Sequence, residues 1–253
     1  MAANQQNSNR FTLEICANSI ESATAAQKGG AHRIELCTNL AEGGTTPSYG
    51  QIKWCLENLQ LEVWPLIRAR GGDFLYTDAE FESMLLDITY CKKIGCHGVV
   101  TGILNTDGSI DQERCRQIIS TASPMPVAFH RAFDMSNDLS KNLESIIDLG
   151  FVRLLTSGGK ENALTGANEI AQLILQAEER IEIMPGTGIN AENIIEIAKI
   201  TGAKSFHTTA KSVIKSKMQF RNHKSKMGAE GDEFSCEQTD VNKVKALKEI
   251  LNN

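Results

Sequence analysis

Two short segments with the same pattern carry residues that are well suited to chemistry. Glu14–Cys16 (EIC) closes the first apolar run of the chain, and Glu35–Cys37 (ELC) closes the second. Alternate side chains of a β-strand share a face, so each glutamate lies on the same face as the cysteine two residues later. Carboxylates transfer protons, and thiolates bind soft metal ions. The repeated pattern therefore predicts two glutamates and two thiols on one side of neighbouring strands.

Arginine and histidine side chains follow three other apolar runs. Arg68 and Arg70 follow the third run, His130 and Arg131 close the fifth, and His207 lies in the eighth. A buried charge is costly unless it is paired, so the inward glutamates require these arginines or a ligand. In one interpretation they form a Glu–Arg network that only holds the fold together. In the other, cationic donors face a small anion, with acid and base groups beside it.

The second interpretation divides the polar side chains into two groups. Arg68, Arg70 and Arg131 would clamp the anion, and Asp134 belongs to the same ligand-binding group. Those that would transfer protons, as catalytic groups, are Glu14, Glu35, His130 and His207.

Glycine-rich turns follow the sixth and seventh apolar runs. Residues 156–159 read TSGG, and residues 185–188 read PGTG. Such turns expose backbone N–H groups, and a helix that starts behind them adds partial positive charge. They predict a site for phosphate or another small oxyanion, formed by Ser157, Gly158, Gly186 and Gly188. The alternative is that the glycines only permit tight turns with positive φ.

The two inward cysteines raise the question of a metal ion. Cys16 and Cys37 lie at the ends of neighbouring strands, whose axes are about 4.8 Å apart in a parallel sheet. Thiolates at this spacing can share a soft ion such as Cu(I). A disulfide is also geometrically conceivable, although a reducing compartment disfavours it. From spacing alone, the alternative is that both are small core residues.

Eight short runs of apolar or β-branched residues alternate with amphipathic stretches of helical spacing. The runs cover residues 11–16, 33–37, 62–68, 97–101, 126–131, 151–156, 180–184 and 204–208. Glycines 30, 95, 150 and 202 stand just before the next run, where helix caps occur. The alternation predicts an α/β fold, a TIM-like (β/α)8 barrel in a single domain, which typically needs about 250 residues. An open doubly wound sheet is the alternative.

The barrel brings the candidate residues together, because the carboxyl ends of its strands open onto one pocket. We expect residues 1–10 to form a flexible N-terminal tail and residues 11–253 to form the barrel. Within it, residues 212–238 form a long polar segment, followed by a C-terminal helix near 240–251. Loops of this length are often functional.

Composition narrows the function classes. The 26 Lys and Arg residues face 31 Asp and Glu residues, a net charge of −5, which predicts no nucleic-acid partner. The basic stretch 211–226 is interpreted as a solvated loop. No export signal or membrane segment is visible, and seven cysteines are an odd number, so we expect reduced thiols and a cytoplasmic location.

A series of blocks in the sequence matches a known pattern. The blocks are Glu14–Cys16, Arg33–Cys37, Glu42–Ser48, Arg68–Phe74, Phe129–Met135, Leu154–Gly158, Met184–Ile189 and Phe220–Asn222. In these blocks the chain resembles the CutC family of copper homeostasis proteins. The resemblance implies a cytosolic TIM-like barrel, a homo-oligomer (dimer or tetramer), and Cu(I) handling with Cys16 and Cys37 as metal ligands. Ala69 departs from the family, which usually has proline there.

Three functions remain open at this point. The first is a Cu(I)-binding homeostasis protein. The second is a barrel enzyme that acts on a small anionic or phosphorylated metabolite. The third is a structural oligomer whose polar barrel mouth only closes a charge network.

Overall fold

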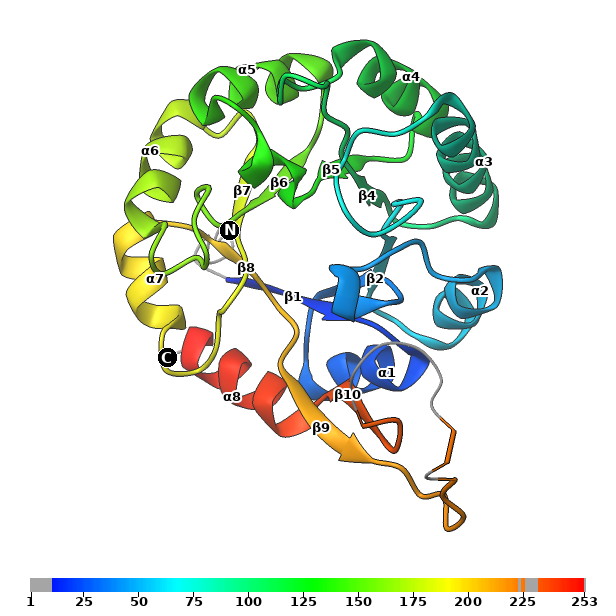
Figure 1. Ribbon diagram of the computed structural model, residues 1–253. Helices are drawn as coiled ribbons and strands as arrows, with labels where there is room; N and C mark the ends of the chain where they lie inside the picture. The colour runs from blue at the N-terminus through cyan, green and yellow to red at the C-terminus, as the bar shows by residue number, and fades with distance from the viewer. Residues whose placement is uncertain (1–10, 223, 226–231, 253) are drawn as a thin grey trace, which may run out of the picture.

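The computed structural model describes residues 11–222, 224–225 and 232–252. The tail expected for residues 1–10 therefore lies outside the described residues. Strands and helices alternate as the sequence pattern predicts, and the (β/α)8 barrel is confirmed (Figure 1).

Parallel strands form the barrel wall, and helices form a ring around it (Figure 1). The wall strands are β1 (Thr12–Ala17), β2 (Arg33–Leu36), β3 (Glu62–Pro65), β4 (Val99–Thr101), β5 (Val127–Phe129), β6 (Arg153–Thr156), β7 (Glu182–Pro185) and β8 (Ser205–Thr208). The helices of the ring are α1 (Ile20–Gly29), α2 (Tyr49–Asn58), α3 (Asp78–Ile94), α4 (Gln112–Ala122), α5 (Leu139–Leu149), α6 (Ala167–Ala177), α7 (Ile194–Thr201) and α8 (Val241–Asn252). Short 3₁₀ helices follow β2 and β5, namely η1 (Leu40–Glu42) and η2 (Arg131–Met135).

Strand pairing closes the wall in two halves. One half has the order β3-β2-β1-β8 and the other has the order β4-β5-β6-β7. Single bridges, Leu66 to Val100 and Gly186 to His207, join the halves. The register pairs Glu14 with Arg33 and Cys16 with Glu35, so Cys16 and Glu35 lie two residues nearer the barrel mouth than Glu14. Closure therefore brings side chains from β1, β2 and β8 to one place.

Glycine ends the helices at the predicted points. Gly30 and Gly150 have φ values of 87° and 89°, in the left-handed region where a β-carbon is strained. Each donates its backbone N–H to carbonyls of the preceding helical turn. Gly95 and Gly202 cap α3 and α7 in the same conformation. These stops let the chain turn directly into the next strand.

Period-two alternation sorts the strand residues between two cores. Ile15 and Leu36 are fully buried in the large core between strands and helices. Inward residues near the mouth form a smaller cluster inside the barrel, made of Cys16, Cys37, Trp64, Leu66, Val100 and Ala128. Each cysteine thus has its strand neighbour on the opposite face.

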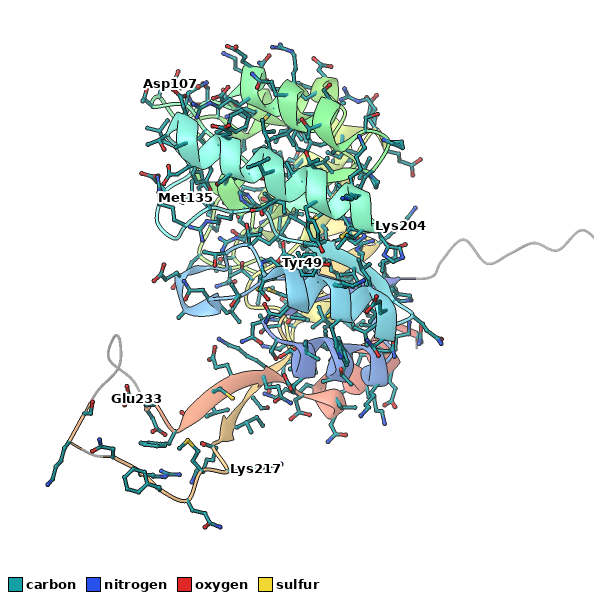
Figure 2. The ribbon with its side chains drawn as sticks, turned by 90° about the vertical axis from the view of Figure 1, so that its right-hand side faces the viewer. Tyr49, Asp107, Met135, Lys204, Lys217 and Glu233 are labelled. Atoms are coloured by element: carbon teal, nitrogen blue, oxygen red, sulfur yellow. The ribbon has the colours of Figure 1, made fainter. Side chains whose placement is uncertain are left out.

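A two-stranded arm interrupts the unit after β8. β9 (Lys211–Lys215) pairs antiparallel with β10 (Ser235–Thr239), where the sequence pattern predicts only a polar segment. Figure 2 shows that the chain beyond this pair, marked by Lys217 and Glu233, extends away from the barrel. Val213 and Ile214 are exposed on β9, and such strands lack the buried face that makes a strand evident in sequence.

None of the helices over the described residues combines the length and the apolar character that crossing a bilayer requires.

Candidate functional site

A pocket of about 460 Å³ opens at the carboxyl ends of the strands. Its charged and chemically reactive lining residues come from β1, β2 and β8, from the segments just after β3 and β5, and from the start of β9. They are Cys16, Glu35, Arg68, His130, Arg131, His207 and Lys211. Enzymes of this fold place their chemistry at the same end of the barrel.

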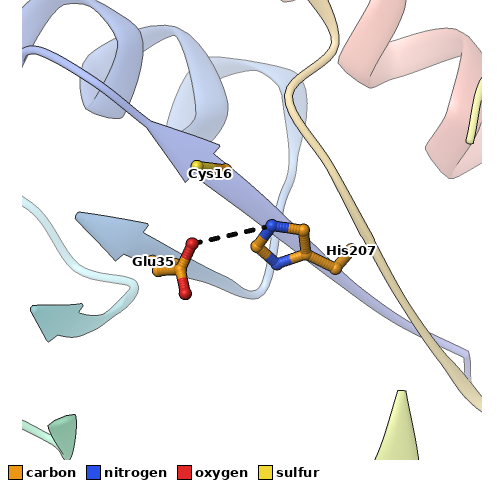
Figure 3. A group of neighbouring side chains, drawn as sticks. All are labelled: Cys16, Glu35 and His207. Carbon is orange, nitrogen blue, oxygen red and sulfur yellow. Dashed lines mark ion pairs between the residues drawn. The ribbon is translucent and has the colours of Figure 1, made fainter. Parts of the chain in front are cut away.

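Three of these residues form a compact cluster. The sulfur of Cys16, a carboxylate oxygen of Glu35 and a ring nitrogen of His207 all lie within 4.8 Å of one another. Figure 3 shows them carried by β1, β2 and β8, with His207 Nε2 lying 3.6 Å from Glu35 Oε2. Cys37 lies behind this cluster, its sulfur 3.6 Å from that of Cys16. Sulfur, carboxylate and imidazole are all metal-binding groups.

The surroundings favour the protonated forms of two members of the cluster. The hydrogen bond to Cys37, with burial, raises the pKa of Cys16 well above its ordinary value. Burial also raises the pKa of Glu35, and the nearby Glu14 carboxylate adds to the rise. A cation bound among these groups would reverse both effects, because it stabilises the thiolate and the carboxylate.

Glu14 lies below the pocket, in the barrel interior, and does not line it. It accepts hydrogen bonds from Arg33, from Arg153 at 3.4 Å and from His207 Nδ1 at 2.7 Å. Burial alone would raise the pKa of Glu14, but the charge of Arg33 and the contacts with His207 hold it below its ordinary value. Its ionised carboxylate keeps a proton on His207 Nδ1, which leaves Nε2 facing Glu35.

The two arginine partners of Glu14 are residues that the sequence analysis did not propose for the site. Arg33 and Arg153 also bond to Glu182, at 3.2 and 2.7 Å, and Arg153 stacks on Trp64 at 4.2 Å. The sequence carried a signal for Arg33, which stands two residues before Glu35 and therefore shares its inward face. The bridge from β1 to Arg153 on β6 crosses the barrel and has no local signal.

Two arginines that are close in sequence take opposite directions. Arg68 is buried and lines the pocket, where it donates to the carbonyls of Glu42, Gly44 and Gly72 at 2.7, 2.8 and 2.6 Å. Arg70 lies outside the pocket and pairs with Asp73 and Glu80. The structure thus brings only the first of the pair to the site.

His130 lines the pocket as a neutral side chain. Its Nδ1 accepts the backbone N–H of Ala132 at 3.2 Å, so the ring proton is on Nε2. Burial, with the positive charges of Arg68 and Arg131, lowers the pKa of His130 to about 3. Its ring packs against Phe74, with 4.9 Å between ring centroids.

The glycine turn after β6 is filled by a carboxylate of the chain itself. Asp134 accepts the backbone N–H groups of Ser157 and Gly159, each at 3.0 Å, and the hydroxyl of Thr156 at 2.5 Å. Arg131 closes the arrangement with a 2.8 Å ion pair to Asp134. Ser157 and Gly158 do not line the pocket, so this turn recognises an anion, but an internal one.

The turn after β7 faces the pocket at a different point. Gly188 and Thr187 line it, whereas Gly186 pairs with Thr156 and His207 in the wall. Thr187 has a φ of 78°, which is strained for a β-branched residue. Such strain is tolerated where the surrounding structure fixes the backbone.

Comparison with known proteins identifies the family. A profile of the CutC family matches residues 11–212. The chain is 50% identical over 237 residues to a CutC family protein of Parabacteroides distasonis, covering 92% of this chain and 98% of the relative. The chain belongs to the CutC family. A human relative described as a copper homeostasis protein cutC homolog is 47% identical, covering 97% of this chain and 90% of that protein.

Comparison with solved structures agrees with the assignment to the CutC family. The crystal structure of CutC from Streptococcus agalactiae superposes with a TM-score of 0.76 at 38% identity, covering 79% of this chain and 98% of that one. An aldolase, QR15, superposes with a TM-score of 0.61 at 15% identity, covering 81% and 93%, and shows a shared barrel fold alone.

Among the residues singled out from the sequence, this CutC chain gathers one set at the pocket and leaves another outside it. The set at the pocket is Cys16, Glu35, Arg68, His130, Arg131, Gly188 and His207. The set outside is Glu14, Cys37, Arg70, Asp134, Ser157, Gly158 and Gly186. Pocket residues that the sequence analysis missed include Phe74 and Thr187, which lie in loops without periodicity, and Lys211, which begins the exposed strand β9.

Proposed function

We propose that this CutC protein acts in copper homeostasis and binds Cu(I) through the thiolates of Cys16 and Cys37. The observation that carries the proposal is the 3.6 Å separation of their sulfur atoms on neighbouring strands. Soft thiolates prefer Cu(I) to hard cations. The name of the human relative supports the same role.

The sulfur spacing suits a bent rather than a linear arrangement. Thiolate–metal bonds are about 2.3 Å long for zinc. With two bonds of that length, sulfur atoms 3.6 Å apart require a sulfur–metal–sulfur angle well below 180°. A bent arrangement leaves room for a third ligand, and Glu35 or His207 is near enough to Cys16 to supply it. Cys16 lines the pocket while Cys37 is fully buried, so the ion would arrive by way of Cys16.

An anaerobic Cu(I) titration against a competing chelator tests the proposal. We expect the parent protein to bind one equivalent, and Cys16→Ser and Cys37→Ser each to weaken binding strongly. Losing a hydrogen-bond partner of a metal ligand costs roughly 10- to 100-fold, so losing the ligand itself should exceed that. Cys115→Ser, at a buried helical cysteine away from the pocket, is the matched control. Unchanged affinity in both the Cys16 and the Cys37 variant would remove the copper assignment.

The pocket supports a second candidate function, a barrel enzyme that acts on a small anionic metabolite. Its specific support is the His207 side chain, held by Glu14 at Nδ1 and facing Glu35 with Nε2, as a proton-transfer group requires. Arg68 and Arg131 line the same pocket and carry positive charge. Turnover of a phosphorylated or carboxylated metabolite that is lost in His207→Gln would support this candidate.

We also propose a cytoplasmic location and a homo-oligomeric state. All seven cysteines are free thiols, including the adjacent pair Cys16 and Cys37, which suits a reducing compartment. Large apolar side chains are exposed on the arm and on the segment that follows β9. Among them are Val213, Met218 and Phe220, which supports contact with a second copy. Cell fractionation and light scattering of the purified protein test the two points.

A further inference from the structure

We propose that the pocket binds a small oxyanion, a carboxylate or a phosphate group, at a subsite formed by Arg68, His130 and Arg131. This proposal rests on the second candidate function and names its ligand class. The proposal is independent of copper, because none of the three side chains is among the proposed copper ligands. His130 here is a hydrogen-bond donor rather than the proton-transfer group expected from the sequence.

Arg68 contributes a buried positive charge without a carboxylate to balance it. Its side chain is 4% exposed, and its guanidinium donates to three backbone carbonyls. Over the part of the chain that the structure describes, no Asp or Glu oxygen lies within ion-pair distance of it. Arg33, Arg70, Arg114, Arg131, Arg153 and Arg180 all have such a partner. A buried charge is costly unless paired, so this position favours an anionic ligand.

His130 contributes a neutral donor of fixed direction. Nδ1 accepts the Ala132 N–H, so Nε2 must carry the proton, and Nε2 is buried without a hydrogen-bond partner among the described residues. An unsatisfied buried donor is costly, and an oxygen acceptor in the pocket would satisfy it. The two neighbouring arginines oppose protonation of the ring, so it donates to an oxygen without releasing a proton.

Phe74 packs against both donors, and the positive charge of Arg68 acts on the His130 ring. The Arg68 guanidinium carbon and the His130 ring centroid each lie 4.9 Å from the centre of the Phe74 ring. Arg131 follows His130 directly and lines the same pocket, and its Nε and one terminal nitrogen are held by Asp134 and Ser157. A planar carboxylate or a phosphate meets such clustered N–H donors well.

The rest of the pocket limits the orientation and size of the ligand. Arg68 and Arg131 bring the guanidinium groups of the pocket lining, whereas Cys16, Glu35 and His207 line it from β1, β2 and β8, where Glu35 would repel an anionic group once ionised. The anionic end therefore faces Arg68 and His130, and the remainder of the ligand reaches toward the cluster. A volume of about 460 Å³ admits a small metabolite.

Calorimetric titration of the metal-free protein at constant ionic strength tests the subsite. The probes are inorganic phosphate and succinate, with chloride as the background anion. We expect saturable one-site binding of at least one probe. The better probe identifies the source of the oxyanion, phosphate ester or carboxylate. Absence of saturable binding for both probes would overturn the proposal.

The variants separate recognition from a merely structural role. His130→Asn keeps an acceptor for the Ala132 N–H but removes the Nε2 donor, and we expect binding at least tenfold weaker. Arg68→Lys should weaken binding by a similar factor, although its loss of carbonyl contacts can also loosen the loops. Arg70→Met, outside the pocket, is the matched control and should bind as the parent does. Equal affinity of His130→Asn and the parent would contradict the subsite.

Two further measurements keep this test independent of the other proposals. The double variant Cys16→Ser/Cys37→Ser should still bind the probe, so a failed copper titration leaves the subsite standing. Binding without turnover of any metabolite would support the subsite while counting against the enzyme candidate. The His130 Nε2 proton, observed by ¹⁵N NMR, should exchange more slowly with water when the probe is bound.

Discussion

One hydrogen bond determines what His130 does. Because Nδ1 is committed to the Ala132 N–H, the ring proton is on Nε2, and burial beside Arg68 and Arg131 keeps the ring neutral. A histidine in the same sequence position without that backbone contact would be free to act as a base. The residue type alone therefore did not define its role.

The lowered pKa of His130 predicts how stability depends on pH. Its pKa is about 3 in the folded protein against 6.5 in the unfolded chain, so the unfolded state binds the extra proton as the pH falls below 6.5. Stability is therefore lost from about pH 6.5 downward, by about 2 kcal/mol at pH 5. Between pH 7.5 and pH 5, the unfolding free energy measured with urea should fall by this amount more in the parent than in His130→Asn. Equal losses in the two proteins would contradict this prediction.

Glu14 illustrates a different use of a buried charge. Glu14→Gln leaves Arg33 and Arg153 with Glu182 as their remaining carboxylate partner. Removing one partner of a buried ion pair costs about 3–5 kcal/mol, and we expect a loss of this size in urea unfolding. Glu57→Gln, at the exposed pair with Lys53, is the matched control and should leave the unfolding free energy unchanged. A small effect of Glu14→Gln would mean that the network contributes little.

At the scale of elements, the loops after the strands decide which polar groups reach the pocket. Within a strand the direction of a side chain follows from alternation, so Cys16 and Glu35 point inward as predicted from their positions. Arg68 and Arg70 lie beyond the end of β3, where turns rather than the pleat set direction. Although only two residues apart in sequence, Arg68 therefore lines the pocket and Arg70 lies outside it.

The β6–α6 loop depends on the carboxylate of Asp134. Asp134→Ala removes the acceptor for two backbone N–H groups and the Thr156 hydroxyl, each worth about 1 kcal/mol, and also the ion-pair partner of Arg131, so we expect a loss of at least about 3 kcal/mol. Amide hydrogen exchange should accelerate at Ser157 and Gly159. Added formate should raise the melting temperature of the variant by more than it raises that of the parent. Formate without effect would show that the cradle does not accept a free carboxylate.

At the scale of the whole molecule, the arm and the barrel have different surfaces. The barrel buries most of its apolar residues and exposes scattered ones such as Leu86 and Leu175, whereas Val213 at 67%, Met218 at 60% and Phe220 at 75% are exposed within one short segment, on the arm and just beyond it. Exposed apolar side chains gathered on one projection are typical of a contact between protein copies.

Light scattering on arm variants tests that contact. We expect Val213→Ser/Phe220→Ser to lower the measured mass toward that of one chain, 27.7 kDa, because it removes apolar area from the contact. Leu86→Ser, at an exposed apolar position of α3, is the control and should keep the parent mass. An unchanged mass in the arm variant would place the interface elsewhere, and a monomeric parent would remove the oligomer proposal.

The sequence by itself determined the strand–helix alternation, the barrel, the glycine helix stops and the inward face shared by glutamates and cysteines. All of these depend on local periodicity or on backbone conformations that one residue type favours. Only the tertiary structure decided that Glu14 bonds to Arg33 and Arg153, that Asp134 fills its own neighbouring loop, and that Arg68 rather than Arg70 faces the pocket. Those outcomes depend on barrel closure and loop direction, which join residues as far apart in sequence as Glu14 and Arg153 and leave no periodic trace.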